Sequence, residues 1–398
     1  MELKIFEETQ IKYNPPTMTI QIDGTNTVNK GAELMLYTVL ERLEQHYSEA
    51  RIIYVPNIPR NYIRIDTGLS LHERKILRYS RYPEAVLRRL QLPRSYFTTK
   101  YPRADLDVVL DAGGFQFSDQ WGYPFHFIDL LENYYKKLHA SGCKIIFLPQ
   151  AFGPFESAQG KRTVEIINAY AHLIIAREQV SYDHLIAAGA DPAKVRIYPD
   201  FTLAVSGTLP ENLLHLKNKV CIILNKKMIT HTRHGAEQYL EVMQALIQHC
   251  VKNGKDVFLL NHEGEGDLQL CHKLNAVMQD KLEVVTGLNA KQIKGVIGQA
   301  YMVISSRFHG VASALSQAVP CLSTSWNHKY KMLFKDYQLE DRILSMESTL
   351  ETLKNQVDTI LNTEKNAAMR THLATEKQKL NVKINTMWEE VFDVMGDI

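Results

Sequence analysis

The clearest indication of the fold lies in the stretch MVISSRFHGVA, which spans Met302–Ala312. Its first residues form a short apolar run, which is typical of a strand that is buried on both faces. The polar residues Ser305–Arg307 then predict a tight turn, and the apolar residues after them predict a helix that runs to Ala318. A strand followed by a turn and a helix is the repeating unit of a parallel sheet covered by helices.

The same alternation recurs along most of the chain, which predicts an α/β fold built on parallel strands. Gly142 and Gly189 follow two of the predicted helices, where a left-handed residue commonly ends a helix. The segment Ser206–Pro210 interrupts the pattern, so we expect two α/β halves that join near residue 208. The predicted strands are Met18–Ile22, Ile52–Val55, Val108–Leu110, Ile145–Leu148, Leu173–Ala176, Val195–Tyr198, Val220–Leu224, Val257–Leu260, Leu282–Val285, Met302–Ile304 and Cys321–Ser323.

The overall composition excludes several classes of protein. The chain has 398 residues, of which 45% are hydrophobic, and its 46 Lys and Arg residues nearly balance its 44 Asp and Glu residues. This excludes an intrinsically disordered chain, and the small net charge of +2 gives no indication of nucleic-acid binding. The five cysteines include no C-x-x-C pair, which argues against a disulfide framework and a structural zinc site.

The sequence also predicts the cellular compartment. The first residues, Met1–Glu8, are partly acidic, whereas a secretory signal would begin with basic residues and continue with an apolar core. The longest stretch without charge, Phe308–Asn327, is interrupted by Gly310, Pro320 and several serines, so it does not predict a membrane-spanning helix. We therefore expect a cytoplasmic protein.

Two residues of the opening stretch are the first candidates for a functional site. Functional groups of open α/β sheets collect at the carboxyl ends of the strands, and Arg307 and His309 follow the strand Met302–Ile304. The guanidinium of Arg307 would hold a carboxylate or a phosphate, and the start of the helix adds backbone N–H donors. The imidazole of His309 would transfer a proton near neutral pH. The alternative is a surface ion pair for Arg307 and a satisfied core position for His309.

Other strand ends carry polar or glycine-rich turns. Arg177 follows one strand, where the alternative to a ligand site is a local ion pair with the next residue. Gly113 and Gly114 follow another, either to let the backbone approach a ligand closely or to form a tight turn. Gln150 lies at the end of a third. The turn at residues 23–33 lacks the pattern G-x-G-x-x-G, so a dinucleotide-binding fingerprint is absent.

Together these residues resemble the motifs of the polysaccharide pyruvyl transferase family, whose members place pyruvate ketals on glycans. The ordered set spans about residues 22–340 and is more specific than any one of its motifs. Ala112 departs from the family pattern, because many members have a third glycine there, and residues 26–30 differ from the commoner glycine-rich approach. The matching residues are Asn29, Gly31, Glu33, Gly113, Gly114, Gln150, Gly153, Pro154, Ala176, Arg177, Glu178, Ser181, Leu185, Gly189, Asp200, Ser305, Arg307, His309, Pro320 and Lys329.

The resemblance implies a GT-B-like architecture, in which two Rossmann-like domains face each other across a cleft. We place the N-terminal, acceptor-side domain at residues 1–207, with a basic insertion at about 70–103. The C-terminal, donor-side domain is expected at residues 208–347. A helical segment at residues 348–398 is expected to pack back on the first domain.

The resemblance also implies phosphoenolpyruvate as the donor, a co-substrate used without a further cofactor or a metal. Its phosphate and its carboxylate require more than one cation. His309 is the expected general acid or base, and Arg307 is expected to assist it at the reacting centre. The residues expected to bind the donor are Arg177, Arg307, Ser305, Ser306, Gly310 and Lys329.

The acceptor implied by the resemblance is a sugar of a polysaccharide or of a lipid-linked glycan. Two of its hydroxyls would attack C2 of the donor in turn, and phosphate would leave. Trp121 offers an aromatic face that would stack on a sugar, and His262 follows a predicted strand of the second half. The residues expected on the acceptor side are Asn29, Gly113, Gly114, Gln150, Trp121 and His262.

Two charged stretches have alternative interpretations. Residues 74–103 are strongly basic and rich in aromatic side chains, with Glu84 as their one acidic residue. They either contact an anionic membrane surface, at the inner face of the membrane, or form the solvated face of an inserted helical hairpin. The stretch His262–Asp267 contains metal-ligand types without the spacing of a zinc site, so we expect loop roles there.

Two other functions are compatible with the same motifs. One is a nucleotide-sugar-dependent glycosyltransferase of GT-B architecture, which would be protected by a nucleoside diphosphate sugar. The other is a non-catalytic glycan-binding or assembly protein, against which the presence of both Arg307 and His309 argues. The fold by itself does not separate these functions, because one scaffold hosts many activities.

Overall fold

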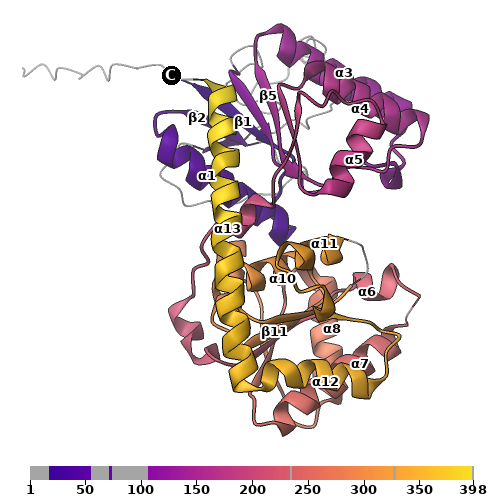
Figure 1. Ribbon diagram of the computed structural model, residues 1–398, viewed down its shortest axis with the longest axis vertical. Helices are drawn as coiled ribbons and strands as arrows, with labels where there is room; N and C mark the ends of the chain where they lie inside the picture. The colour runs from indigo at the N-terminus through magenta and orange to yellow at the C-terminus, as the bar shows by residue number, and fades with distance from the viewer. Residues whose placement is uncertain (1–17, 55–70, 74–105, 234, 326–328, 397–398) are drawn as a thin grey trace, which may run out of the picture.

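The computed structural model describes residues 18–54, 71–73, 106–233, 235–325 and 329–396. Within these ranges the chain forms two parallel β-sheets, each covered by helices, which lie one above the other in Figure 1. This arrangement confirms the predicted pair of α/β halves. The basic residues 74–103, with their predicted membrane contact or helical hairpin, lie outside the described residues. Among the described residues, no helix is both long and apolar enough to cross a membrane.

The first sheet has seven strands in the order β3-β2-β1-β4-β5-β6-β7. All neighbouring strands are parallel, and the order reverses between β1 and β4. This is the doubly wound order of a Rossmann fold, in which ligands bind where the order reverses. The strands are β1 (Thr19–Asp23), β2 (Arg51–Tyr54), β3 (Leu71–Glu73), β4 (Val108–Asp111), β5 (Lys144–Gln150), β6 (Leu173–Ala176) and β7 (Val195–Ile197).

The second sheet repeats this topology with six parallel strands in the order β10-β9-β8-β11-β12-β13. Its order reverses between β8 and β11, so the two halves are doubly wound in the same way. The short edge strands β3 and β13 were not predicted, because two or three residues give no periodic pattern. The strands are β8 (Val220–Ile223), β9 (Val257–Leu260), β10 (Glu283–Val285), β11 (Met302–Ser305), β12 (Cys321–Thr324) and β13 (Ile343–Leu344).

The central strands are almost wholly apolar because helices cover both faces of each sheet. Every residue of β4, β6, β8, β9, β11 and β12 is buried. The helices turn one apolar face to the sheet and leave the other in water. They are α1 (Lys30–His46), α3 (Phe125–Ala140), α4 (Ala158–Tyr170), α5 (Gln179–Ala187), α6 (Lys227–Thr230), α7 (Ala236–Lys252), α8 (Gly264–Val277), α9 (Ala290–Gly298), α10 (Phe308–Leu315), α11 (Lys329–Asp336), α12 (Leu350–Leu361) and α13 (Thr363–Met395).

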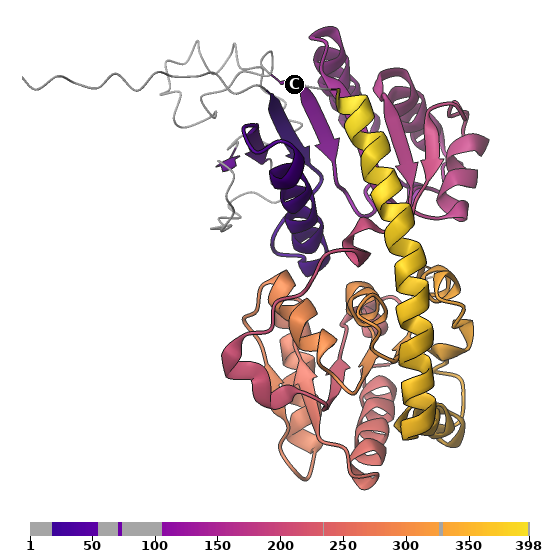
Figure 2. The ribbon, with the colours of Figure 1, turned by 60° about the vertical axis from the view of Figure 1, so that its left-hand side comes forward.

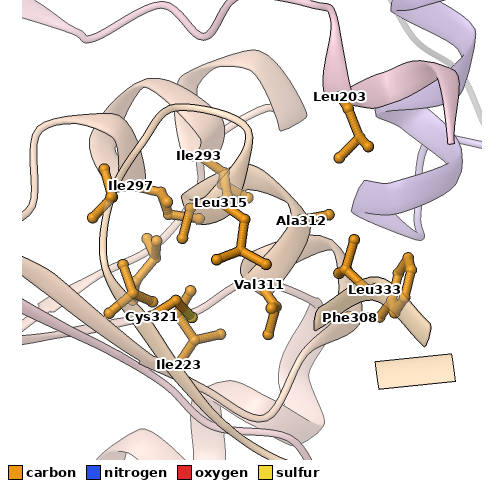
Figure 3. Packing of buried hydrophobic residues seen from close by; sticks show 14 of the residues in the cluster. Leu203, Ile223, Ile293, Ile297, Phe308, Val311, Ala312, Leu315, Cys321 and Leu333 are labelled. Atoms are coloured by element: carbon orange, nitrogen blue, oxygen red, sulfur yellow. The ribbon is translucent and has the colours of Figure 1, made fainter. Parts of the chain in front are cut away.

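Helix α10, which follows β11, is anchored deep in the core of the second half. Val311 and Leu315 are fully buried and belong to the same apolar cluster as Ile223 of β8 (Figure 3). Figure 3 also shows Leu203, from the link between the halves, pointing toward Ala312 of this helix. Because α10 is held by close packing, its first turn is fixed in place.

The two C-terminal helices pack differently. Helix α12 packs against α7 of the second half, whereas α13 runs along both halves (Figures 1 and 2). The first part of α13 binds the second half, where Arg370 donates to the carbonyls of Ala300 and Tyr301 at 2.7 and 2.8 Å. Its last part binds the first half, where Glu390 accepts a hydrogen bond from Nε of Arg196 at 2.6 Å. The predicted return of the chain to the first half is therefore made by α13.

The link between the halves is tightly packed against α9. Gly207 and Gly295 lie so close together that a Cβ on either residue would overlap backbone atoms. Lys294 is fully buried and donates a hydrogen bond to the carbonyl of Thr202 at 2.7 Å. Helices α1 and α9 also contact each other directly. The two halves are thus held by the link, by this helix contact and by α13.

Candidate functional site

The two places where the strand order reverses face each other across a cleft of about 280 Å³. Loops that follow β1, β4 and β6 line it from the first half, and loops that follow β8, β9, β11 and β12 line it from the second. Such positions are the usual ligand sites of doubly wound sheets. The residues that line it include Gly24, Asn26, Asn29, Gly113, Gly114, Phe115, Gln116, Gln120, Trp121, Arg177, Asn225, Lys227, His262, Glu263, Arg307, Phe308, His309, Lys329 and Tyr330.

Arg307, the residue before the first turn of α10, is held by two carboxylates. Its Nε and one terminal nitrogen donate to Asp267 at 2.7 and 2.6 Å, and the other terminal nitrogen donates to Glu263 at 2.7 Å. Burial disfavours the charged guanidinium, but the hydrogen bond to Asp267 and the charge of Glu263 raise the pKa of Arg307 above its ordinary value. The guanidinium is therefore always charged and fixed in position, and its main partners are within its own half.

A second cation reaches the cleft from the first half. Arg177, at the end of β6, is buried and binds Asp200 at 3.3 Å and Glu178 at 3.5 Å. Its guanidinium lies over the ring of Phe308, 4.8 Å from the ring centre, and Nζ of Lys329 lies 5.0 Å from the same centre. Phe308 thus holds one cation of each half by cation–π contact.

Two lysines of the second half complete the cationic cluster. Burial, followed by the charges of Arg177, Lys227 and Arg307, lowers the pKa of Lys329 to about 7. The pKa of Lys227 is also lowered, by burial first and then by the charge of Arg307. A cluster that depresses the pKa of its own lysines favours an anion, because the anion would offset the repulsion.

His309 projects from the first turn of α10 against the other half. Gly31, in the first turn of α1, lies so close that a Cβ there would overlap the imidazole. Nε2 of His309 is buried without a hydrogen bond in the described part of the chain, and it lies 3.9 Å from Oδ2 of Asp200. Burial lowers the pKa of His309 to about 4, although the charge of Asp200 opposes the shift. The imidazole is therefore neutral at pH 7, which suits a proton acceptor.

On the first half, the cleft is formed by backbone and amide groups. Asn29 caps α1, because its Oδ1 accepts from the amides of Gly31 and Ala32 at 3.0 and 3.1 Å. Its Nδ2 donates across the cleft to Glu263 at 3.0 Å. Gly113 lies where a Cβ would come within 2.5 Å of the Gln116 amide, so only glycine fits there without rearrangement.

Trp121 and His262 lie at opposite sides of this cleft. Trp121 is 43% exposed and packs edge to face on Phe115, with ring centres 5.6 Å apart. His262 follows β9 and is almost fully buried. Burial and the charge of Arg307 hold the pKa of His262 well below its ordinary value, so it is neutral at pH 7. Of the two, Trp121 is thus the more accessible to a ligand.

Three of the residues expected to bind the donor do not line the cleft. Ser305 supports the turn, because its Oγ accepts from the amide of Arg307 at 3.0 Å. Ser306 is bonded through its Oγ to buried hydroxyls of neighbouring elements. Gly310 is buried within the first turn of α10, where a Cβ would come within 2.5 Å of Oγ of Ser305. These residues build the turn and do not face a ligand.

Gln150 is also behind the cleft. Its side chain is fully buried, and its Nε2 donates to Oδ1 of Asp111 at 3.3 Å. Gln116, which does line the cleft, also donates to Asp111. Gln150 therefore supports the cleft wall from beneath and does not itself line the cleft.

Several cleft residues were not predicted. Lys227 follows β8 much as Arg307 follows β11, so a systematic search of strand ends for cations would have found it. Glu263 and Asp267 were considered only as metal-ligand types, since their pairing with Arg307 depends on tertiary structure. Phe308 is apolar, and nothing in the sequence indicated that it lines the cleft beside its polar neighbours.

The chain is similar to known proteins in sequence and in fold. The model of the polysaccharide pyruvyl transferase family matches residues 29–328. A solved structure of Anabaena HepE in complex with UDP-glucose shares 12% identity, covers 94% of this chain and 100% of its own, and superimposes with a TM-score of 0.57. The structure of a putative UDP-N-acetylglucosamine 2-epimerase from Listeria monocytogenes shares 11% identity and has a TM-score of 0.54. The match covers 94% of this chain and 96% of the epimerase chain. These structures confirm the GT-B-like arrangement of two Rossmann-like domains.

Proposed function

The chain belongs to the polysaccharide pyruvyl transferase family, and we propose that it transfers the enolpyruvyl group of phosphoenolpyruvate to two hydroxyls of one sugar. The acceptor sugar is part of a polysaccharide or of a lipid-linked glycan precursor. The product is a pyruvate ketal, and phosphate is released. The observation that carries this proposal is the meeting of Arg177, Lys227, Arg307 and Lys329 at one cleft between the domains.

The cationic cluster matches the charge of the donor. Phosphoenolpyruvate carries a phosphate with a charge of about −1.5 to −2, as other phosphate monoesters do near pH 7, together with a carboxylate. Arg177 and Lys329 lie on one aromatic ring, and Lys227 lines the same cleft. The backbone amides at the start of α10 add donors and a favourable dipole for an anion. Arg307 is held by Asp267 and Glu263, which fix its guanidinium at the wall of the cleft.

His309 is the residue best placed to move a proton. Its neutral imidazole would accept the proton of the first sugar hydroxyl as that oxygen bonds to C2 of the donor. The protonated imidazole passes this proton to C3, which becomes the methyl group. The bond from C2 to the phosphate oxygen then breaks, the second hydroxyl bonds to C2, and its proton leaves with the phosphate. Both hydroxyl protons are thus accounted for, and no oxidant or reductant is required.

The first test is the reaction itself. The protein is incubated with phosphoenolpyruvate and a panel of glycans, and phosphate release is measured together with the mass gain of a pyruvyl ketal. Lys329→Met is expected to weaken donor binding, whereas Lys273→Met, which removes an exposed lysine of α8, is the matched control and should behave as wild type. Phosphate release without a pyruvyl product, or no loss in Lys329→Met, would contradict the proposal.

A second candidate comes from the HepE structure, which holds UDP-glucose. If this chain were a nucleotide-sugar-dependent glycosyltransferase, UDP-glucose would raise its melting temperature and phosphoenolpyruvate would not. The same comparison of the two ligands tests a non-catalytic glycan-binding role, for which neither donor would stabilise the protein. Stabilisation by phosphoenolpyruvate alone supports the pyruvyl transferase.

A further inference from the structure

A second cavity, of about 370 Å³, lies in the first domain beside the cleft. Its walls come from the segment after β4 and from the segment after β5, which includes the start of α4. Because the carboxyl ends of parallel strands meet at one edge of a sheet, this cavity opens along the same edge as the cleft. The donor cations lie outside it, and nothing in the proposed reaction requires it.

One short segment separates the cavity from the cleft. Within residues 115–124, Gln116 and Trp121 line the cleft, whereas Ser118, Asp119 and Tyr123 line the cavity. The segment is therefore a thin wall with a ligand-sized space on each side. The same segment carries Trp121, whose side chain is 43% exposed.

The chemistry of the cavity suits a sugar ring. Its base is apolar and includes Ile128 and Phe155, and Tyr123 is held by stacking on Phe127 with ring centres 4.5 Å apart. The side-chain amide of Gln159 lies at the rim and makes no hydrogen bond within the described part of the chain. A sugar presents an apolar C–H face and a ring of hydroxyls, so it requires this combination of aromatic surface and amide groups.

The wall itself is rigid. The carboxylate of Asp119 accepts hydrogen bonds from the backbone amides of Glu156 and Ser157, at 2.5 and 2.8 Å, and from the hydroxyl of Ser157. Ser118 caps the short helical turn that leads to Trp121, by accepting from the amide of Gln120 at 3.2 Å. The cavity is therefore preformed, which reduces the ordering cost of binding.

We propose that this cavity binds the sugar next to the reacting sugar, so that the protein selects an acceptor of at least two sugar units. The inference rests on the proposed pyruvyl transfer. A polysaccharide acceptor has to leave the cleft beside the reacting unit, and the segment of residues 115–124 borders both the cleft and the cavity. Tyr123 would contact the C–H face of the second sugar, and Gln159 would bond to its hydroxyls.

Kinetics with matched acceptors tests the proposal. For the sugar identified by phosphate release, the methyl glycoside is compared with disaccharides that contain the same sugar. Gln159→Trp fills the cavity and Gln159→Ala removes its amide. Gln159→Ala is expected to raise the KM for the disaccharide by up to about tenfold, as for the loss of one hydrogen bond, and Gln159→Trp is expected to raise it at least as much. Neither variant should change the KM for the methyl glycoside. Phe125→Ala, an exposed residue that lines neither space, is the control.

A binding measurement without donor separates the two proposals. Saturation-transfer NMR is recorded with a panel of disaccharides and with methyl glycosides of their component sugars. Contact of both sugar rings with the wild-type protein, lost for one ring in Gln159→Trp and retained in Phe125→Ala, supports the cavity even if no phosphate is ever released. Contact confined to one ring in the wild type, or an unchanged spectrum in Gln159→Trp, overturns it.

Discussion

The two sheets have the same strand order, yet the points where that order reverses carry opposite charge. In the first half, the buried Asp23 and Asp111 end β1 and β4. Tyr134 donates to Asp23 at 2.6 Å, and the amide of Gly113 donates to Asp111 at 3.1 Å, so these carboxylates are satisfied beneath the cleft floor. In the second half, the equivalent loops carry cations that line the cleft itself.

This difference divides the work between the halves. Apart from Arg177, the first half presents backbone and amide groups, which suit uncharged hydroxyls. The second half presents most of the cations, which suit a phosphate and a carboxylate. Topology therefore locates the cleft, whereas a few side chains at strand ends determine what each wall binds. His309 is the exception, because it belongs to the charged half and contacts the first helix of the other.

The largest effect is expected at His309, where the second half contacts the first. His309→Ala should lower the rate of phosphate release by about 10²- to 10⁴-fold, the usual contribution of a general acid or base. Circular dichroism and donor binding should stay close to wild type, because the change removes a proton acceptor and leaves the four cations in place. A variant with near-normal turnover would show that His309 only packs the two halves together.

Gly31→Ala tests the same contact from the opposite half. The new methyl group would overlap the imidazole and displace it, and a misplacement of about 1 Å is enough to cost roughly 10²-fold in rate. Gly235→Ala, just before α7 and outside the cleft, is the matched control, because a Cβ there meets no atom within 4 Å in the described part of the chain. Steady-state kinetics of the two variants should differ sharply. Equal activities would mean that His309 is not required in its observed position.

The charge of the second half should make donor binding depend on pH. Lys329 must be protonated to attract an anion, and its pKa is lowered to about 7. Between pH 7 and 9, above the second pKa of a phosphate monoester at about 6, affinity should fall by up to about tenfold per pH unit. Lys329→Arg stays charged and should give a nearly flat profile by calorimetric titration. A fall that is equally steep in this variant would exclude Lys329 as its cause.

The smallest effect is expected where α13 reaches the first half. The pair of Arg196 and Glu390 is partly exposed, with side chains 40% and 25% accessible to solvent. Glu390→Gln should therefore lower the free energy of unfolding by only about 0.2–1 kcal/mol. Urea unfolding measures this change. A loss several times larger would show that the contact controls the docking of the two halves and is more than a surface ion pair.

The sequence predicted the central strands well because each is a short apolar run between helical stretches. It also identified most of the charged cleft residues, since Arg177, Arg307, His309 and Lys329 all line the cleft. A motif does not indicate which way a side chain points. The sequence therefore did not show that Ser306 and Gln150 are buried behind the cleft. The partners of Arg307 come from a different loop and helix, so no local pattern connects them.

The length of α13 constrains how the protein moves. Its 33 residues span about 50 Å, at about 1.5 Å per residue, and its two parts are bonded to different halves. The link at Gly207 is a second connection between the same two bodies. Two bodies joined at two places swing most easily about the line through both joints. We therefore expect the cleft to open by rotation of the two halves about that line, which would admit substrates from the side that faces away from it.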